Sequence, residues 1–130
     1  MPCALVVDDH FHNVKLLEAQ LMIASFDVMT ALSGEEALSK LEERKPDIIL
    51  LDIMMPNMDG FEVCRRVRAN PETADIPVVM VTALDKQIDR VMASDVGADE
   101  FFTKPVEDHL LMQAIRLLIK KKDAPSAAAS

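Results

Sequence analysis

Short apolar runs alternate along the chain with segments whose apolar residues recur at helical spacing, and this alternation restricts the fold more than any other feature. The expected strands are residues 3–8, 26–32, 47–52, 76–82 and 98–103. The expected helices are residues 12–24, 33–43, 59–70 and 85–95, with a last helix after residue 105. Three of the strands are apolar on both faces, as in a parallel sheet covered by helices on each side. The sequence therefore predicts an α/β fold, a (βα)5 doubly wound parallel five-stranded sheet.

Length, composition and charge narrow the class of protein. With 130 residues the chain is the size of one domain, expected over residues 1–122, and residues 123–130 are small and polar like a flexible tail or linker. The formal net charge of −8 opposes unassisted binding to nucleic acid. No apolar run approaches the roughly 20 residues of a membrane span, and there is no secretory signal, so a cytoplasmic location is expected. Cys3 and Cys64 lie far apart and are expected to be buried, reduced thiols.

The residues that follow the strands are chemically unusual. Asp8 and Asp9 end the first strand and Asp52 ends the third, while Thr82 and Lys104 follow the fourth and fifth strands. A single aspartate at a strand end usually caps a helix or forms a turn. In a doubly wound sheet, however, these ends meet beside the ligand site, where clustered carboxylates would repel each other. A divalent cation such as Mg²⁺, together with a lysine ammonium, would offset that repulsion.

Four motifs carry a resemblance to a known family. They are LVVDD at residues 5–9, DIILLDIMMPNMDG at 47–60, VVMVTA at 78–83 and GADEFFTKP at 97–105. In this order and spacing they resemble the receiver domain of two-component response regulators over residues 3–120. The chain is also similar to the first receiver of PleD-type regulators, which are diguanylate cyclases. The resemblance implies a flavodoxin-like strand order 2-1-3-4-5.

The resemblance also implies catalytic and switch roles. Asp52 would be the phosphoacceptor, and Lys104 would contact a phosphoryl oxygen. Thr82 would move toward the phosphoryl group and bond it, and Phe101 would be the aromatic switch residue that fills the vacated space. Lys104 and Pro105 would be joined by a cis peptide bond.

For the metal, the resemblance implies that Asp8 and Asp9 would hold Mg²⁺ with Asp52, directly or through water. The backbone carbonyl of Met54 would add a further ligand. Catalysis would be limited to self-phosphorylation and self-dephosphorylation.

The implied partners are a sensor histidine kinase or a histidine phosphotransfer protein. The face formed by the fourth helix, the fifth strand and the fifth helix would change on phosphorylation, and it would make a homodimer or dock an effector. No direct contact with nucleic acid is expected, since Arg65, Arg66 and Arg68 are taken as a solvated helix face. His10 is likewise expected to be solvated, as are His12 and His109.

Two other functions remain open. A small-molecule phosphatase or phosphotransferase of the haloacid dehalogenase type would also use a carboxylate nucleophile. That class has an Asp-x-Asp pattern after the first strand, whereas this chain has adjacent Asp8 and Asp9. The second alternative is a receiver-like scaffold that is never phosphorylated, which would need none of these acidic, hydroxyl and lysine groups.

Overall fold

The computed structural model describes residues 1–123 and shows strands and helices in strict alternation. Its strands are β1 (Cys3–Val7), β2 (Asp27–Ala31), β3 (Ile48–Leu51), β4 (Val78–Thr82) and β5 (Glu100–Thr103). Its helices are α1 (Phe11–Ile23), α2 (Gly34–Glu43), α3 (Gly60–Ala69), α4 (Gln87–Asp95) and α5 (Asp108–Asp123). The predicted tail at residues 123–130 lies outside the described residues, apart from the backbone of Asp123.

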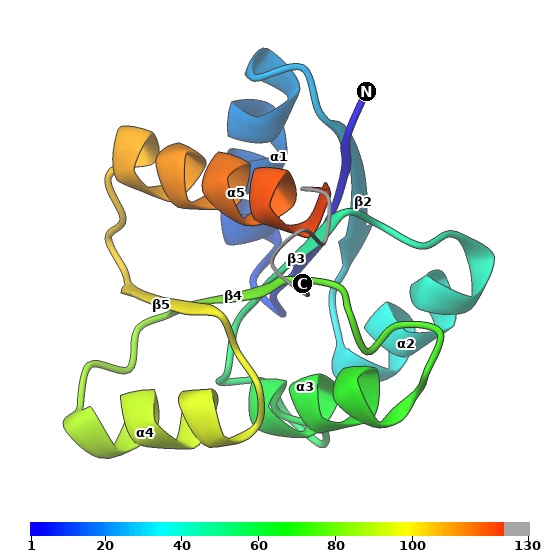
Figure 1. Cartoon of the computed structure of the whole chain (residues 1–130). Helices are drawn as coiled ribbons and strands as arrows, with labels where there is room; N and C mark the ends of the chain where they lie inside the picture. Colours follow the sequence, from blue (N-terminus) through cyan, green and yellow to red (C-terminus); the bar gives the residue numbers. More distant parts are fainter. Residues whose placement is uncertain (124–130) are drawn as a thin grey trace, which may run out of the picture.

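The strands form one parallel sheet in the order β2-β1-β3-β4-β5, which confirms the predicted fold. Helices α1 and α5 cover one face of the sheet, and α2, α3 and α4 cover the other (Figure 1). The three runs that are apolar on both faces are the interior strands, and every residue of β1, β3 and β4 is buried. The edge strands β2 and β5 are only partly buried.

Alternation along the interior strands divides the core into two apolar layers. Side chains on one face of the sheet pack with α2, α3 and α4, and this layer includes Leu5, Val7, Ile49, Leu51, Val78, Met80, Ala37, Val63, Val67 and Ala93. Side chains on the other face pack with α1 and α5, and this layer includes Ala4, Val6, Ile48, Leu50, Val79, Val81, Val14, Leu21, Leu111 and Ile115. Because both layers cover the interior strands β1, β3 and β4 completely, polar side chains follow these strands only at their ends.

Helix boundaries follow the capping signals. Ser33 Oγ accepts a hydrogen bond from the Glu36 N–H at 3.0 Å, and Asp59 Oδ1 accepts one from the Glu62 N–H at 2.9 Å. The Glu36 carboxylate reaches back one residue further than a capping box requires, to the Leu32 N–H at 2.7 Å. Gly97, with φ of 100°, follows the end of α4 as predicted.

Three predicted boundaries were wrong by two residues. The fourth strand begins at Val78 rather than residue 76, since Pro77 has no N–H to donate to a neighbouring strand. The fourth helix begins at Gln87, after an extended Lys86, rather than at residue 85. The fifth strand begins at Glu100 rather than at residue 98. None of these shifts moves the carboxyl end of a strand.

Arg68 was wrongly assigned to a solvated helix face. Its guanidinium donates five hydrogen bonds, to the carbonyl oxygens of Ala74, Ile76 and Gly97 and to the Asp99 carboxylate. The Arg68 guanidinium therefore joins α3 to the segments that lead into β4 and β5. By contrast Arg65 and Arg66 are exposed and pair with Glu62, as a solvated face requires.

Replacing Arg68 is expected to destabilise the fold without touching the carboxyl ends of the strands. Arg68→Ala removes the only described side-chain donors of three carbonyl groups, and we expect the free energy of unfolding to fall by about 2 kcal/mol. Urea unfolding measures this change. The matched control is Arg65→Ala on the same helix, for which a change within about 0.5 kcal/mol is expected. Equal losses in the two variants would contradict the bridging role.

Both cysteines are buried and free, which confirms the predicted reduced thiols. Burial raises the pKa of the Cys64 thiol to about 11, and its Sγ lies 3.3 Å from the Val96 carbonyl oxygen. Among residues 1–123, no helix has the length and apolar character that crossing a bilayer requires.

Candidate functional site

The register of the sheet places two buried carboxylates side by side. Val7 pairs with Leu51, so the next residues, Asp8 and Asp52, emerge together from neighbouring strands. The Asp52 N–H donates to the Val7 carbonyl at 2.9 Å, which holds the two strand ends together beyond the last pair. Both aspartates are buried, at 2% and 3% exposure. Such burial of two carboxylates is costly unless other groups compensate for it.

Lys104, which follows the edge strand β5, supplies a positive charge to the two carboxylates. Its N–H donates to the Thr82 carbonyl at 2.8 Å, which positions the residue at the end of β5. The ammonium then lies 2.7 Å from Asp8 Oδ2 and 3.5 Å from Asp52 Oδ2. The Lys104–Pro105 peptide is cis, as the resemblance implies. The structure thus brings three of the predicted residues into direct contact.

The pKa values of the two buried carboxylates shift in opposite directions. Burial opposes the charged form of Asp8, but hydrogen bonds from Lys104 and from the His10 N–H hold its pKa below the ordinary value. Burial raises the pKa of Asp52, and the neighbouring Thr82 hydroxyl and Lys104 ammonium only partly offset that effect. Asp8 is thus the carboxylate better matched to Lys104.

Asp9 leaves one buried oxygen atom without a hydrogen bond from the described residues, although His10 Nδ1 lies 3.1 Å from it. Its Oδ1 is buried yet accepts no hydrogen bond from residues 1–123, although the side chain as a whole is 26% exposed. One ligand atom from each of Asp8, Asp9, His10 and Asp52 can be chosen so that all four lie within 4.8 Å of one another. Carboxylate oxygens this close together, one of them buried without a hydrogen bond, fit a divalent cation such as Mg²⁺.

Thr82 and Met54 border the Asp52 carboxylate. The Met54 N–H donates to Asp52 Oδ1 at 3.3 Å, while its side chain is 53% exposed. Thr82 is fully buried at the end of β4, and its hydroxyl accepts a bond from the Leu84 N–H at 3.4 Å. The Met54 N–H and the Thr82 hydroxyl therefore lie next to the Asp52 carboxylate.

The two phenylalanines of β5 point to opposite faces of the sheet. Phe102 packs against the layer under α1 and α5, in agreement with its predicted core role. Phe101 packs against the other layer, and the Arg90 guanidinium of α4 lies 4.7 Å from its ring centre. Phe101 is only partly buried, so the ring lies at the boundary between core and surface.

His10 is a member of the cluster that the sequence analysis missed. It was expected to be solvated, and its side chain is indeed 66% exposed. Its Nδ1 nevertheless lies 3.2 Å from Asp8 Oδ1 and 3.1 Å from Asp9 Oδ1. The only available signal was its position next to two aspartates, which spacing alone does not distinguish from a solvated turn.

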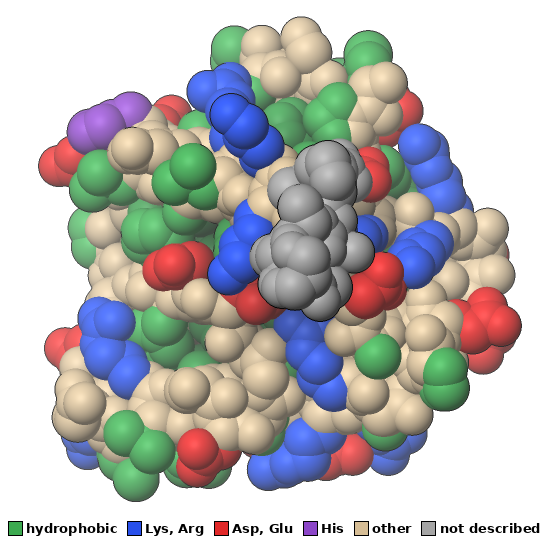
Figure 2. Space-filling view, in the orientation of Figure 1, with side chains coloured by type: hydrophobic (Ala, Val, Ile, Leu, Met, Phe, Trp, Pro, Cys, Tyr) green, Lys and Arg blue, Asp and Glu red, His purple; other side chains and the backbone are tan. Residues whose placement is uncertain are grey.

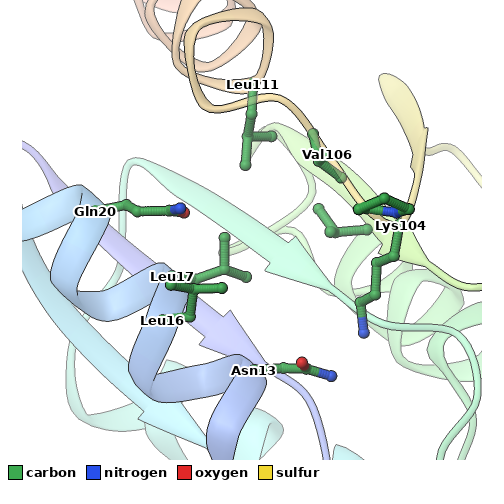
Figure 3. A pocket seen from close by; sticks show the side chains of 9 residues that line it. Asn13, Leu16, Leu17, Gln20, Lys104, Val106 and Leu111 are labelled. Atoms are coloured by element: carbon green, nitrogen blue, oxygen red, sulfur yellow. The ribbon is translucent and has the colours of Figure 1, made fainter.

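An apolar pocket of about 370 Å³ adjoins the site (Figure 3). It lies between α1 and the segment that joins β5 to α5, and its lining includes Asn13, Leu16, Leu17, Gln20, Val81, Pro105, Val106 and Leu111. Lys104 also lines the pocket, while its ammonium extends past it to the aspartates. The pocket and the acidic cluster therefore share Lys104.

Comparison with known proteins gives consistent matches. Residues 4–116 match the family described as response regulator receiver domain. The response regulator PleD of Caulobacter vibrioides is 49% identical over 118 residues, which cover 91% of this chain and 26% of that protein. The alkaline phosphatase synthesis transcriptional regulatory protein PhoP of Bacillus subtilis is 40% identical over 125 residues, which cover 95% of this chain and 51% of that protein.

Solved structures give the same picture. A putative response regulator from Chloroflexus aurantiacus J-10-fl has a TM-score of 0.87 at 32% identity, with 91% of this chain and 97% of that chain covered. The chemotaxis protein CheY4 of Vibrio cholerae has a TM-score of 0.86 at 30% identity, with 91% and 98% covered. This chain spans only 26% and 51% of the lengths of the two curated relatives, so their other activities do not transfer to it.

Proposed function

The chain belongs to the response regulator receiver domain family, and on that premise we propose that it is a signalling switch that accepts a phosphoryl group on Asp52. The donor would be a histidine kinase or a histidine phosphotransfer protein. The observation that carries the proposal is the Lys104 ammonium, which lies between the buried Asp8 and Asp52 carboxylates at 2.7 Å and 3.5 Å. A scaffold that is never phosphorylated has no need for this buried charge cluster.

The proposed reaction is a transfer between two nucleophiles. A carboxylate oxygen of Asp52 attacks the phosphorus of phosphohistidine, and a P–O bond forms as the P–N bond breaks. The donor imidazole leaves with the electron pair. The Lys104 ammonium would contact an oxygen of the transferred phosphoryl group, since it already lies near Asp52 Oδ2. Hydrolysis reverses the state: water attacks phosphorus, the P–O bond to Asp52 breaks, and phosphate and a proton are released.

Asp8, Asp9 and Asp52 would hold the cation, with the backbone carbonyl of Met54 as a further ligand. The unsatisfied Asp9 Oδ1 supports this assignment. Mg²⁺ bound there would neutralise charge on the transferred oxygens. Asp8, whose Oδ2 also accepts from Lys104, would keep the ammonium beside the nucleophile.

Phosphorylation would be passed on through Thr82 and Phe101. Thr82 would bond the new phosphoryl oxygens, which are stronger acceptors than a carboxylate. Its loop would then shift, together with Leu84, whose N–H bonds the Thr82 hydroxyl and whose carbonyl accepts from Thr103 Oγ1 on β5. The Phe101 ring, which is only partly buried, would then change its position.

A phosphorylation assay with product mapping tests the proposal. The protein is incubated with acetyl phosphate, with Mg²⁺ or with a chelator, and intact mass and peptide mapping follow the product. We expect one adduct, located at Asp52 and formed only with Mg²⁺. Continuous turnover of p-nitrophenyl phosphate would favour the haloacid dehalogenase alternative instead, and absence of any adduct would favour the scaffold.

The phosphorylated state is expected to be long-lived. The apolar side chains of Met54 and Leu84 belong to the two loops that border Asp52, and neither can orient an attacking water. In Met54→Asn/Leu84→Glu, polar groups at both positions are expected to raise the dephosphorylation rate about tenfold or more. The rate is measured with excess Mg²⁺, with the exposed Met22→Asn as the control. An unchanged rate in the double variant would refute the shielding by these side chains.

The face formed by α4, β5 and α5 is expected to self-associate after phosphorylation. Figure 2 shows charges of both signs interspersed with hydrophobic side chains over these elements. Mixed charges such as Asp89, Arg90, Glu100 and Arg116 suit reversible, salt-sensitive contacts. We expect sedimentation to show a larger species when a phosphoryl mimic is bound, and Arg116→Glu to weaken it. A monomer of unchanged size under both conditions, with unchanged spectra for this face, would rule out the expected response.

A further inference from the structure

We propose that His10 is a nitrogen ligand of the cation site, which gives this site a preference for late first-row divalent ions over Mg²⁺. The inference rests on the proposed function in one respect, namely that a divalent cation binds among Asp8, Asp9 and Asp52. It goes beyond it in assigning a ligand that an all-oxygen magnesium site does not contain.

The backbone of His10 is fixed at the edge of the cluster. Its N–H donates to Asp8 Oδ1 at 2.9 Å, and its carbonyl accepts from the N–H groups of Asn13 and Val14 at 3.0 and 3.2 Å. These bonds join the end of β1 to the first turn of α1. The Cα of His10 therefore has little freedom relative to the aspartates.

The side chain of His10 contacts the aspartates and does not cap helix α1. His10 occupies the N-cap of α1, a position where a side chain usually accepts a hydrogen bond from the helix, but it makes no such bond. Instead its Nδ1 lies 3.2 Å from Asp8 Oδ1 and 3.1 Å from Asp9 Oδ1. The imidazole thus faces the carboxylates although two thirds of the side chain is exposed.

The unsatisfied Asp9 oxygen distinguishes a ligand from a simple counter-ion. Asp9 Oδ1 is the atom nearest to Nδ1 in that residue, yet the pair does not meet hydrogen-bond geometry. A cation bound to both atoms would take the Nδ1 lone pair in place of the proton that Nδ1 donates to Asp8 Oδ1, and that proton would move to Nε2 or to solvent. Together with Asp8 and Asp52, this gives three carboxylates and one imidazole whose ligand atoms lie within 4.8 Å of one another.

The chemistry of this donor set determines the expected selectivity. Mg²⁺ takes oxygen ligands and retains water, so an imidazole adds little to its affinity. Zn²⁺ and Co²⁺ bind imidazole well, and their affinity for mixed nitrogen and oxygen sites exceeds that of lighter ions such as Mn²⁺. His10 would therefore let these ions compete with Mg²⁺ at the site that Asp52 shares.

Direct binding measurements on the whole chain test the inference. Calorimetry gives the affinities for Mg²⁺, Zn²⁺ and Co²⁺, and the visible absorption of bound Co²⁺ together with ¹⁵N shifts of the imidazole reports nitrogen ligation. In His10→Asn we expect the Zn²⁺ and Co²⁺ affinities to fall by at least roughly tenfold, the loss that follows even when only a hydrogen-bond partner of a metal ligand is removed. The Mg²⁺ affinity should stay within about twofold of wild type. His12→Asn, a neighbouring exposed histidine, is the matched control and should change neither.

Charge and ligation are separated by a second variant. His10→Lys keeps a cation beside the aspartates but offers no lone pair at Nδ1. We expect it to weaken all three ions, without the selective loss seen in His10→Asn. Equal Zn²⁺ affinity in wild type and His10→Asn would overturn the ligand role and leave the magnesium site intact. An equal loss of Mg²⁺ and Zn²⁺ affinity in His10→Asn would also overturn it, and would show only that the site is perturbed. No binding of any ion in wild type would instead refute the cation site itself.

Discussion

Asp52→Asn is expected to abolish phosphorylation completely. The substitution removes the carboxylate that follows β3 next to Asp8. This carboxylate accepts hydrogen bonds from the Lys104 ammonium and the Met54 N–H. The amide has nearly the same size, but its oxygen is a far weaker nucleophile toward phosphorus. After incubation with acetyl phosphate and Mg²⁺, intact mass should show the full adduct in wild type and none above background in the variant.

The control for this experiment is Asp95→Asn, which makes the same change at an exposed residue at the end of α4. It should be phosphorylated like wild type. Thermal unfolding verifies that Asp52→Asn is folded, as we expect, because the Lys104 ammonium keeps its shorter contact with Asp8. A folded Asp52→Asn protein with an undiminished adduct would eliminate Asp52 as the phosphoacceptor.

Gly60→Ala is expected to combine a large loss of stability with a loss of phosphorylation. A Cβ atom at this position would lie 2.3 Å from the Asp52 carbonyl oxygen and 2.7 Å from the Ile53 Cα. Both are backbone atoms, so no side-chain rotation relieves the overlap. The Gly60 N–H also donates to the Ile53 carbonyl at 2.9 Å, which ties the start of α3 to the segment that carries Asp52.

We expect Gly60→Ala to cost about 3 kcal/mol of unfolding free energy, at the upper end for overpacking. The residual folded protein should accept phosphate slowly, because the Asp52 backbone must move. Gly34→Ala is the comparison variant: its Cβ would meet side-chain atoms of Val63 and Met58 at 2.9 and 3.0 Å rather than backbone atoms, so a smaller cost is expected. Urea unfolding compares the two, and an equal, small cost would show that the β3–α3 segment yields easily.

The sequence predicted the number, order and type of the elements because the apolar periodicity of each segment is local information. It also predicted that Asp8, Asp52, Thr82 and Lys104 lie at the same edge, since parallel strands share one carboxyl end. The strand order came from the resemblance to receiver domains and not from periodicity, because apolar patterns do not specify which strands are neighbours. The comparisons and the sheet confirm that order.

Side-chain partners over long separations could not be predicted in the same way. Arg68 lies among exposed arginines on α3, and only the approach of residues 74–76 and 97–99 converts it into a half-buried bridge. His10 likewise differs from a solvated histidine only through the path of the chain from β1 into α1. That Lys104 contacts Asp8 more closely than Asp52 depends on contacts between residues 96 and 52 positions apart in the chain, which no local pattern encodes.

The contact between Lys104 and Asp8 joins residues 96 positions apart in the chain. The cluster is therefore assembled from residues that follow β1, β3 and β5. A chain that is still being synthesised contains the aspartates long before it contains the lysine. Only a chain that has been synthesised past Lys104 and has folded brings all of these side chains together. Under the proposed function, partly folded copies would lack the assembled cluster and would not compete with folded molecules for phosphoryl groups.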